Sequence, residues 1–214
     1  MKKNYCVIIG GGGHSKVLIE TVFLQKKYIP KYILDPNKEL WGKEIFGIKV
    51  LGPDDELGDL KKKGIDYFVV GVGSIKDNLK RKEIYEKAIK LSFEPANIIH
   101  PNAIISKTSK IGRGSQILAG AILNTESEIG ENVLINTGAI IEHNCILKNH
   151  IHISIGARVA STVTIEDLVF IGAGAVLKQN IKVGEGAVIG AGAVVLSDIP
   201  AFKTFIGVPA KEKK

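Results

Sequence analysis

Residues 135–159 read INTGAIIEHNCILKNHIHISIGARV, and every sixth of them, beginning with Ile135, is aliphatic. The same spacing extends in both directions, so that sixteen consecutive slots from Ile105 to Val195 hold Ile, Leu or Val. Four residues after each slot lies a second position that is small or aliphatic. A period of six matches neither the 3.6 residues of an α-helix nor the two of a β-strand, so it predicts a solenoid.

A unit of six residues supplies one short strand and one turn, and three units close a triangular coil of about 18 residues. The repeat is long enough for about five coils, with the aliphatic residues stacked inside. Glycine after an aliphatic slot, as at Gly112 and Gly172, relieves crowding where the chain turns. Cys145 occupies an inward small slot, so core packing is its predicted role.

Residues 1–98 follow a different pattern. An apolar strand at residues 5–9 leads into four glycines and then into helical periodicity over residues 14–27. Further elements are predicted as strands at 31–35 and 66–72, helices at 53–63 and 74–91, and a linker at 92–97. This alternation predicts a small parallel sheet with helices on its faces. The predicted domains are therefore a small α/β domain at residues 1–98 and the solenoid at residues 99–214.

The glycine turn lets backbone N–H groups and a helix N-terminus approach an anion such as a diphosphate. As a dinucleotide fingerprint it lacks the third glycine, because Ser15 stands there, although Asp35 has the spacing of a ribose-binding acid. A NAD-dependent oxidoreductase and a tight turn without any ligand therefore stay open as alternatives.

Charge, cysteine content and hydropathy exclude several classes of partner and site. The chain has 29 Lys and Arg against 22 Asp and Glu, a formal net charge of +7. The excess is spread along the chain and interleaved with acids, which indicates solvated surfaces rather than a nucleic-acid site. Cys6 and Cys145 lie too far apart for a disulfide scaffold or a zinc finger, and no stretch approaches the roughly 18 apolar residues of a membrane span. We therefore expect a cytoplasmic protein with neither membrane nor nucleic acid as partner.

The repeat, closed by Asp198-Ile199-Pro200 and Gly207-Val208-Pro209-Ala210-Lys211, resembles the hexapeptide-repeat acyltransferases. With GGGGHSK at residues 10–16 in front of it, essentially the whole chain is similar to the sialic acid O-acetyltransferase and nucleotide-aminosugar N-acetyltransferase family. The resemblance implies a small Rossmann-like α/β domain that binds a nucleotide sugar, followed by an all-β, left-handed parallel β-helix. It also implies a homotrimer, with acetyl-CoA as co-substrate between neighbouring prisms and no metal.

The resemblance assigns two groups of binding residues by position. The first group would contact the nucleotide sugar and consists of Gly12, Gly13, His14, Asp35 and Gly73. In it, Asp35 would hold the uracil or ribose end. The second group would contact acetyl-CoA and consists of His152, Ser161, Ala173 and Ala191. In it, His152 would bind near the thioester, as a hydrogen-bond donor to the oxyanion, and the other three would lie beside the pantetheine arm.

Acyl transfer from a thioester requires a base for the proton of the attacking amine or hydroxyl, and a neutral imidazole suits that task near pH 7. His143 lies two residues after an inward slot and is predicted to face outward, and the resemblance implies that it is this base. The family usually has Asp or Glu next, whereas Asn144 can orient the imidazole but supplies no charge. Whether Glu142 compensates, the base is weaker, or the acceptor is already a neutral amine stays open.

The expected function is acetyl transfer from acetyl-CoA to the 4-amino group of a nucleotide-linked amino-dideoxy sugar, by direct attack without an acyl-enzyme. O-acetylation of sialic acid is the nearest alternative, and a noncatalytic sugar-nucleotide-binding trimer is the alternative from another class. A metal site formed by His143, His150 and His152 is a further alternative, since carbonic anhydrases also use such solenoids.

Overall fold

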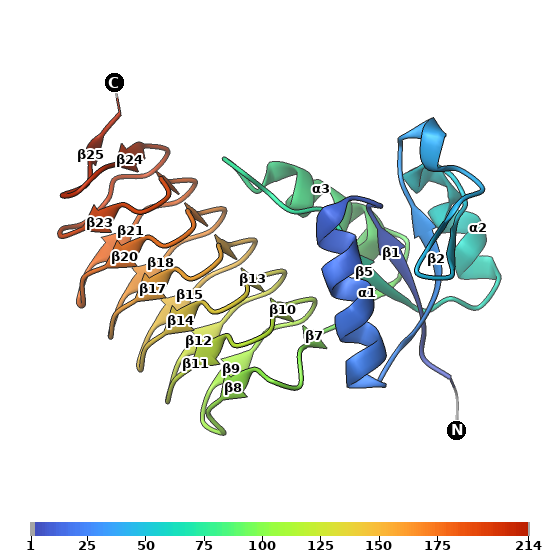
Figure 1. Cartoon of the computed structure of the whole chain (residues 1–214), viewed down its shortest axis with the longest axis horizontal. Helices are drawn as coiled ribbons and strands as arrows, with labels where there is room; N and C mark the ends of the chain where they lie inside the picture. Colours follow the sequence, from blue (N-terminus) through green and yellow to red (C-terminus); the bar gives the residue numbers. More distant parts are fainter. Residues whose placement is uncertain (1–2, 214) are drawn as a thin grey trace. The chain divides into compact units, whose positions relative to one another are not determined.

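The computed structural model describes residues 3–213, which form two compact units (Figure 1). The first unit contains the residues up to Gly73 together with Lys80–Pro101. The second contains Ser74–Leu79 and the residues from Asn102 onward. A short segment from the N-terminal half of the sequence therefore belongs, by its contacts, to the repeat unit. None of the helices within residues 3–213 is long and apolar enough to cross a membrane.

The first unit is built on one sheet with the strand order β3-β4-β2-β1-β5-β6. Its strands are β1 (Tyr5–Ile9), β2 (Ile29–Leu34), β3 (Glu44–Ile45), β4 (Ile48–Val50), β5 (Tyr67–Val70) and β6 (Glu94–Pro95). Its helical elements are α1 (Gly13–Gln25), η1 (Lys38–Leu40), η2 (Asp54–Glu56), α2 (Leu57–Lys62) and α3 (Leu79–Lys90), and β7 (Ile98–Ile99) packs against α1. All neighbouring strands are parallel except β3 and β4, so the α/β prediction is confirmed.

Several elements of the first unit differ from the sequence-based predictions. The linker predicted at 92–97 is wrong, because β6 pairs in parallel with Tyr67 and Phe68 at the edge of the sheet. The hairpin of β3 and β4 was not predicted, since each strand has only two or three residues. Its turn residues, Phe46 and Gly47, both have positive φ, as a tight hairpin turn requires.

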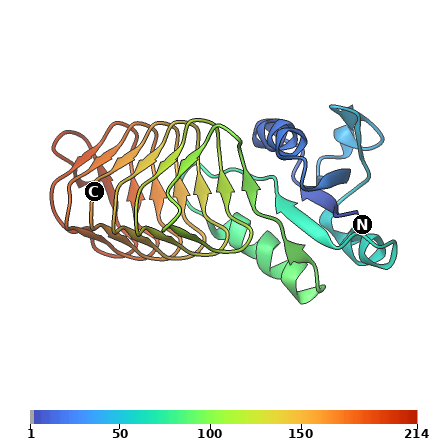
Figure 2. The ribbon, with the colours of Figure 1, turned by 90° about the horizontal axis from the view of Figure 1, so that it is seen from below.

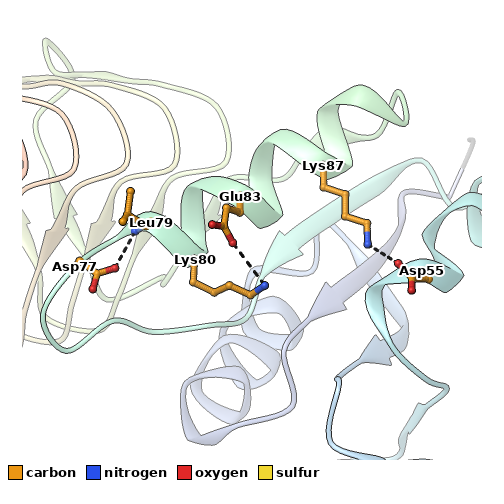
Figure 3. Close-up of polar contacts among 6 residues, drawn as sticks. All are labelled: Asp55, Asp77, Leu79, Lys80, Glu83 and Lys87. Atoms are coloured by element: carbon orange, nitrogen blue, oxygen red, sulfur yellow. Dashed lines mark hydrogen bonds and ion pairs between the residues drawn. The ribbon is translucent and has the colours of Figure 1, made fainter.

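The helix predicted at 74–91 begins only at Leu79. There Asp77 Oδ1 accepts a hydrogen bond from the Leu79 N–H at 3.2 Å and caps the first turn (Figure 3). Along α3, Lys80 pairs with Glu83, and the Lys87 ammonium lies 2.8 Å from the Asp55 carboxylate. Lys87 holds the pKa of Asp55 below its usual value by hydrogen bonding and by charge attraction. All these side chains are solvent-exposed, so they tune the surface of the unit rather than its core.

The second unit is a coil of short strands stacked along one axis (Figure 2). The strands form three ladders, which make the three faces of a prism. Face 1 contains β10 (Gln116–Ile117), β13 (Leu134–Ile135), β16 (His152–Ile153), β19 (Phe170–Ile171), β22 (Val188–Ile189), β24 (Thr204–Ile206) and β25 (Lys211–Glu212). Face 2 contains β8 (Ile104–Ile105), β11 (Ile122–Leu123), β14 (Ile140–Ile141), β17 (Arg158–Val159), β20 (Val176–Leu177) and β23 (Val194–Val195). Face 3 contains β9 (Lys110–Ile111), β12 (Glu128–Ile129), β15 (Ile146–Leu147), β18 (Thr164–Ile165) and β21 (Lys182–Val183).

From β8 to β23, neighbouring strands of a face are parallel and lie 18 residues apart in the sequence, as Ile140 and Arg158 do. At the end of the coil Val188 pairs with Thr204 instead, and β25 pairs antiparallel with β24. Within each two-residue strand, the side chain of the first residue points outward and that of the second points into the prism. All aliphatic slots from Ile117 to Val195 are buried, and so are the small slots from Ser115 to Ala193. Ile105 and Ile111 are partly exposed because they lie in the first coil. The hexapeptide period thus encodes the core of the coil.

Glycine serves two separate purposes in the coil. A Cβ on Gly172 would lie 2.5 Å from the Ala191 nitrogen, because the next coil passes directly over this position. At a different position, every sixth residue from Gly114 to Gly192 has a φ between 53° and 71°, whether it is Gly, Asn, Glu, His, Thr or Leu. Close approach therefore requires glycine at the first kind of position, while the left-handed turn merely favours it at the second.

This difference predicts opposite outcomes for two glycine substitutions. Gly172→Ala should cost about 1–3 kcal/mol of unfolding free energy, because its methyl group displaces backbone atoms of the neighbouring coil. Gly156→Asn is the matched control, since Gly156 has φ +63° and open space around its Cβ position, and asparagine tolerates this conformation. It should change stability by less than about 0.5 kcal/mol. Denaturant unfolding followed by circular dichroism measures both, and equal losses would contradict the distinction.

Candidate functional site

The glycine turn joins β1 to α1 in the first unit. Gly10 has φ +115°, and a Cβ there would lie 2.8 Å from the Val72 side chain, so this glycine is required by packing. Gly12 and Gly13 are exposed, with nothing within 4 Å of a Cβ position. Gly12 is the N-cap of α1 and supplies no side-chain cap. The start of α1 therefore leaves backbone N–H groups exposed at Gly12 and Gly13, where diphosphate binding stays a prediction.

Ser15, which replaces the third glycine of a dinucleotide fingerprint, is fully buried. Its hydroxyl contacts the carbonyl oxygens of Gly10 and Gly71, the latter at 3.2 Å. A Cβ on Gly71 would lie 2.8 Å from this hydroxyl. Ser15 thus ties the end of β1 to the end of β5, which is a structural role.

Asp35 follows β2 and holds the glycine turn from the other side. Its Oδ2 accepts a hydrogen bond from the Gly11 N–H at 2.6 Å, and its Oδ1 accepts one from the Asn37 N–H at 2.8 Å. The indole N–H of Trp41, a residue that the sequence analysis did not single out, donates to the Asp35 main-chain oxygen at 2.8 Å. Asp35 therefore shapes this loop, and a nucleotide would meet a carboxylate that already has two protein donors.

His14 and Gly73 also lie at this edge. A Cβ on Gly73 would lie 3.7 Å from the His14 Cβ, so the loop after β5 borders the first turn of α1. The structure thus gathers all five predicted sugar-nucleotide residues near the carboxyl ends of β1, β2 and β5. This is where open parallel sheets bind ligands.

His143 lies in the second unit, at the corner that joins faces 2 and 3, and its side chain is exposed. Its Nδ1 lies 2.8 Å from Asn144 Oδ1. The Asn144 amide nitrogen donates in turn to Glu126 Oε2 at 2.8 Å. Glu126 occupies the same corner one coil earlier. The sequence analysis missed it, although its spacing of 18 residues from Asn144 was a signal that could have found it. The three side chains form a hydrogen-bonded series that ends on a carboxylate.

Glu142 does not supply the charge next to the imidazole. Its Oε2 accepts from the Asn124 amide at 3.0 Å and from the His143 backbone N–H at 3.3 Å. Of the two nearby carboxylates, Glu142 therefore fixes the backbone of His143, whereas Glu126 lies behind its side chain.

His152 points outward from face 1, as predicted, yet it is only 4% exposed. The segment Ser74–Leu79 covers it: the Ser74 hydroxyl lies 2.7 Å from His152 Nδ1, and the Asn78 amide donates to Val169 O at 2.8 Å. His152 Nε2 lies 3.3 Å from the Asn136 amide, and the ring meets Phe170 edge-on. Sequence reasoning missed Ser74 and Asn136, because only the folded chain brings them to this histidine.

The three remaining predicted residues lie on two corners of the prism. Ser161 stacks directly after His143 on the corner of faces 2 and 3, whereas Ala173 and Ala191 stack on the corner of faces 1 and 2. Their backbone N–H groups have no hydrogen-bond acceptor within residues 3–213, so they are available to a ligand. Face 1 lies opposite the corner of faces 2 and 3, so one chain holds His143 and His152 on opposite sides of its own prism.

The other histidine of the predicted metal site, His150, lies at the corner of faces 3 and 1, where its Nδ1 is 3.0 Å from the Asn132 amide. His143 and His150 thus lie on two different corners of the prism, and His152 lies on face 1. Across residues 3–213, no three His, Cys, Asp or Glu side chains are arranged to hold a metal ion.

Comparison with known proteins gives family matches to both units. Residues 6–88 match the PglD N-terminal domain, and residues 162–197 match the bacterial transferase hexapeptide (six repeats) model. UDP-N-acetylbacillosamine N-acetyltransferase of Bacillus subtilis is 32% identical over 115 residues, which are 52% of this chain and 50% of that protein. The alignment thus spans about half the length of this curated relative.

Solved structures match over nearly the whole chain. A mutant perosamine N-acetyltransferase from Caulobacter crescentus, in complex with CoA and GDP-perosamine, is 34% identical, with a TM-score of 0.91 over 98% of this chain and 96% of that one. The acetyltransferase domain of PglB from Neisseria gonorrhoeae, in complex with acetyl coenzyme A, is also 34% identical, with a TM-score of 0.91 over 99% and 100%.

These matches confirm the predicted fold class, a small Rossmann-like domain followed by a left-handed parallel β-helix. They also confirm the predicted class of enzyme and its acetyl-CoA co-substrate at the level of the family. The chain therefore belongs to the hexapeptide-repeat acyltransferases that comprise sialic acid O-acetyltransferases and nucleotide-aminosugar N-acetyltransferases.

Proposed function

We propose that this chain transfers the acetyl group of acetyl-CoA to the 4-amino group of a nucleotide-linked amino-dideoxy sugar, with His143 as general base. The carrying observation is the exposed imidazole of His143, whose Nδ1 is bonded to an amide oxygen and whose Nε2 is left to accept a proton. An amine acceptor is supported by relatives named as N-acetyltransferases of perosamine and of UDP-N-acetylbacillosamine. A cytoplasmic location belongs to the same proposal.

The reaction follows as direct attack. The acceptor nitrogen forms a bond to the thioester carbonyl carbon, and its proton passes to His143 Nε2. The tetrahedral intermediate then breaks its C–S bond, and the departing CoA thiolate takes the proton from the imidazolium. A positioned base contributes about 10²–10⁴ in rate. The Asn136 amide oxygen accepts from the Thr137 N–H, so its NH₂ group donates one hydrogen to His152 Nε2 at 3.3 Å. The second N–H of Asn136 is the proposed oxyanion donor, and His152 holds it in place rather than donating itself, as the sequence analysis had expected.

Binding of the two substrates uses different backbone surfaces. The proposed diphosphate site is the open turn of Gly12 and Gly13 at the start of α1, where a helix dipole favours an anion. Acetyl-CoA is proposed to lie along the corners that carry Ser161, Ala173 and Ala191. The N–H groups of these residues suit the amide carbonyls of a pantetheine arm, since within residues 3–213 they are bonded to no acceptor.

A homotrimer is part of the proposal because a single prism separates His143 from His152. A neighbouring copy brings its face 1 towards the His143 corner of the first. The outward residues of face 2 supply an apolar ladder for this packing, interrupted by Arg158, and consist of Ile104, Ile122, Ile140, Val176 and Val194. Face 3 carries mixed polar residues instead, with Lys110 and Glu128 paired at 2.6 Å.

An acceptor panel tests the function. Purified protein is incubated with acetyl-CoA and UDP-, dTDP- or GDP-linked 4-amino sugars, sialic acid or its activated form, while released thiol is followed. Release with an amino sugar is expected; release with sialic acid alone would favour O-acetylation, and none with any acceptor would favour a binding module.

His143→Ala should lower kcat roughly a hundredfold or more, whereas His150→Ala, the control, should not. Undiminished turnover by His143→Ala would remove the base.

The proposed homotrimer is tested by one substitution on face 2 and a control substitution on face 3. Ile122→Glu places a charge in the apolar ladder of face 2, where burial against a copy leaves it without a partner. Light scattering after gel filtration should show a trimer for the parent chain and a monomer for this variant. Ile146→Glu on face 3 is the matched control and should stay trimeric. A parent chain of monomer mass would refute the assembly.

Direct attack without an acyl-enzyme predicts that neither cysteine thiol of the folded protein takes part in the reaction. Burial raises the pKa of the Cys6 thiol to about 12 and raises that of Cys145 as well, so near pH 8 only about one Cys6 in ten thousand is a thiolate. A disulfide reagent at pH 8 should label neither cysteine in the folded protein and both after denaturation. Intact mass after acetyl-CoA alone should show no adduct. A stoichiometric acetyl-protein would instead support a covalent intermediate.

A further inference from the structure

We infer that Glu126 is a positioning residue for the general base: through the Asn144 amide, it fixes which nitrogen of His143 is free to accept a proton. The inference rests on the proposed function, in which His143 is that base. Glu126 itself does not touch the imidazole, and its effect passes entirely through Asn144.

The order of donors and acceptors in the series determines the outcome. An ionised carboxylate only accepts hydrogen bonds, so the group that Asn144 turns towards Glu126, 2.8 Å away, must be its NH₂. The amide oxygen of Asn144 then faces His143 Nδ1, at 2.8 Å. Because this oxygen also only accepts, Nδ1 must carry the hydrogen. In a neutral imidazole the lone pair is then on Nε2.

The backbone around the series holds each side chain at its place. Glu126 and Asn144 both have φ +57°, so the two side chains leave the same corner in the same conformation, one coil apart. The Glu126 N–H donates to Thr108 Oγ1 at 3.0 Å, and the His143 carbonyl accepts from the Thr162 N–H at 3.0 Å. The corner is thus fixed from the coil before and from the coil after.

This arrangement answers how the chain functions without the acidic residue that the family usually places after the histidine. The carboxylate is still present, but it comes from the preceding coil and acts across an intervening amide. Its charge acts on the imidazolium from a greater distance than a directly bonded acid, so its electrostatic effect is weaker. Its effect on orientation is undiminished, because each link in the series is directional.

A charge-swap cycle tests the inference. Glu126→Gln replaces the acceptor by an amide that both donates and accepts, so Asn144 is free to turn over; we expect kcat to fall about tenfold with both KM values within about twofold. Asn144→Asp sets two carboxylates against each other, and kcat should also fall. In E126Q/N144D the aspartate accepts from Nδ1–H and the glutamine amide donates to the aspartate, so kcat should return to within about threefold of the parent.

Two further measurements make the result specific. Glu128→Gln, in the same coil and paired with Lys110 rather than with Asn144, should leave kcat unchanged. Nitrogen-15 NMR of the histidine rings, assigned by the signals lost in His143→Gln, should show Nδ1–H for His143 in the parent and a tautomer mixture in E126Q. Losses that simply add in the double variant, or an unchanged kcat and tautomer in E126Q, would overturn the inference.

The NMR arm separates this inference from the proposed function. It uses the free protein and needs no acceptor, so a parent chain that releases no thiol with any acceptor would refute the acetyltransferase proposal while the tautomer result still decided the role of Glu126.

Discussion

Main-chain hydrogen bonds between successive coils are the interaction on which the second unit depends. From β8 to β23, neighbouring strands of a face lie 18 residues apart in the sequence, so residues with that spacing stand in columns. The columns fix where the core, the tight glycine contacts and the outward residues fall. A shift of the register by one residue would turn the aliphatic slots to solvent, which the burial of the core prevents.

The same columns arrange the chemistry. Glu126 reaches Asn144, and Ser161 follows His143, because 18 residues separate each pair along one corner. Side chains that are 18 residues apart in the sequence are thereby neighbours in the folded chain and can form hydrogen bonds with each other. A prism also imposes a separation, since a corner and the opposite face cannot serve one reaction centre from the same chain. The proposed assembly of several prisms is a consequence of that geometry.

The first unit is organised by a different constraint, which is the close approach of β1 and β5 at their carboxyl ends. Gly10 and Gly71 are too crowded to carry side chains, and the Ser15 hydroxyl occupies the space between their carbonyl groups. Asp35 completes the turn by accepting the Gly11 N–H. These contacts fix the backbone on either side of Gly12 and Gly13. The two crowded glycines, Gly10 and Gly71, thus hold the two exposed ones in place.

The sequence by itself determined the solenoid, because a sixfold period repeated over about ninety residues has only one way to bury its aliphatic slots. It also placed His143 on the outside, and strands with following helices in the first unit. The strands of the β3–β4 hairpin and β6 have only two or three residues each, which is too short for their periodicity to be recognised. Only the tertiary structure decided that Ser74–Leu79 covers His152 and that Glu126 lies behind Asn144, because hydrogen bonds between side chains depend on the distances that folding sets.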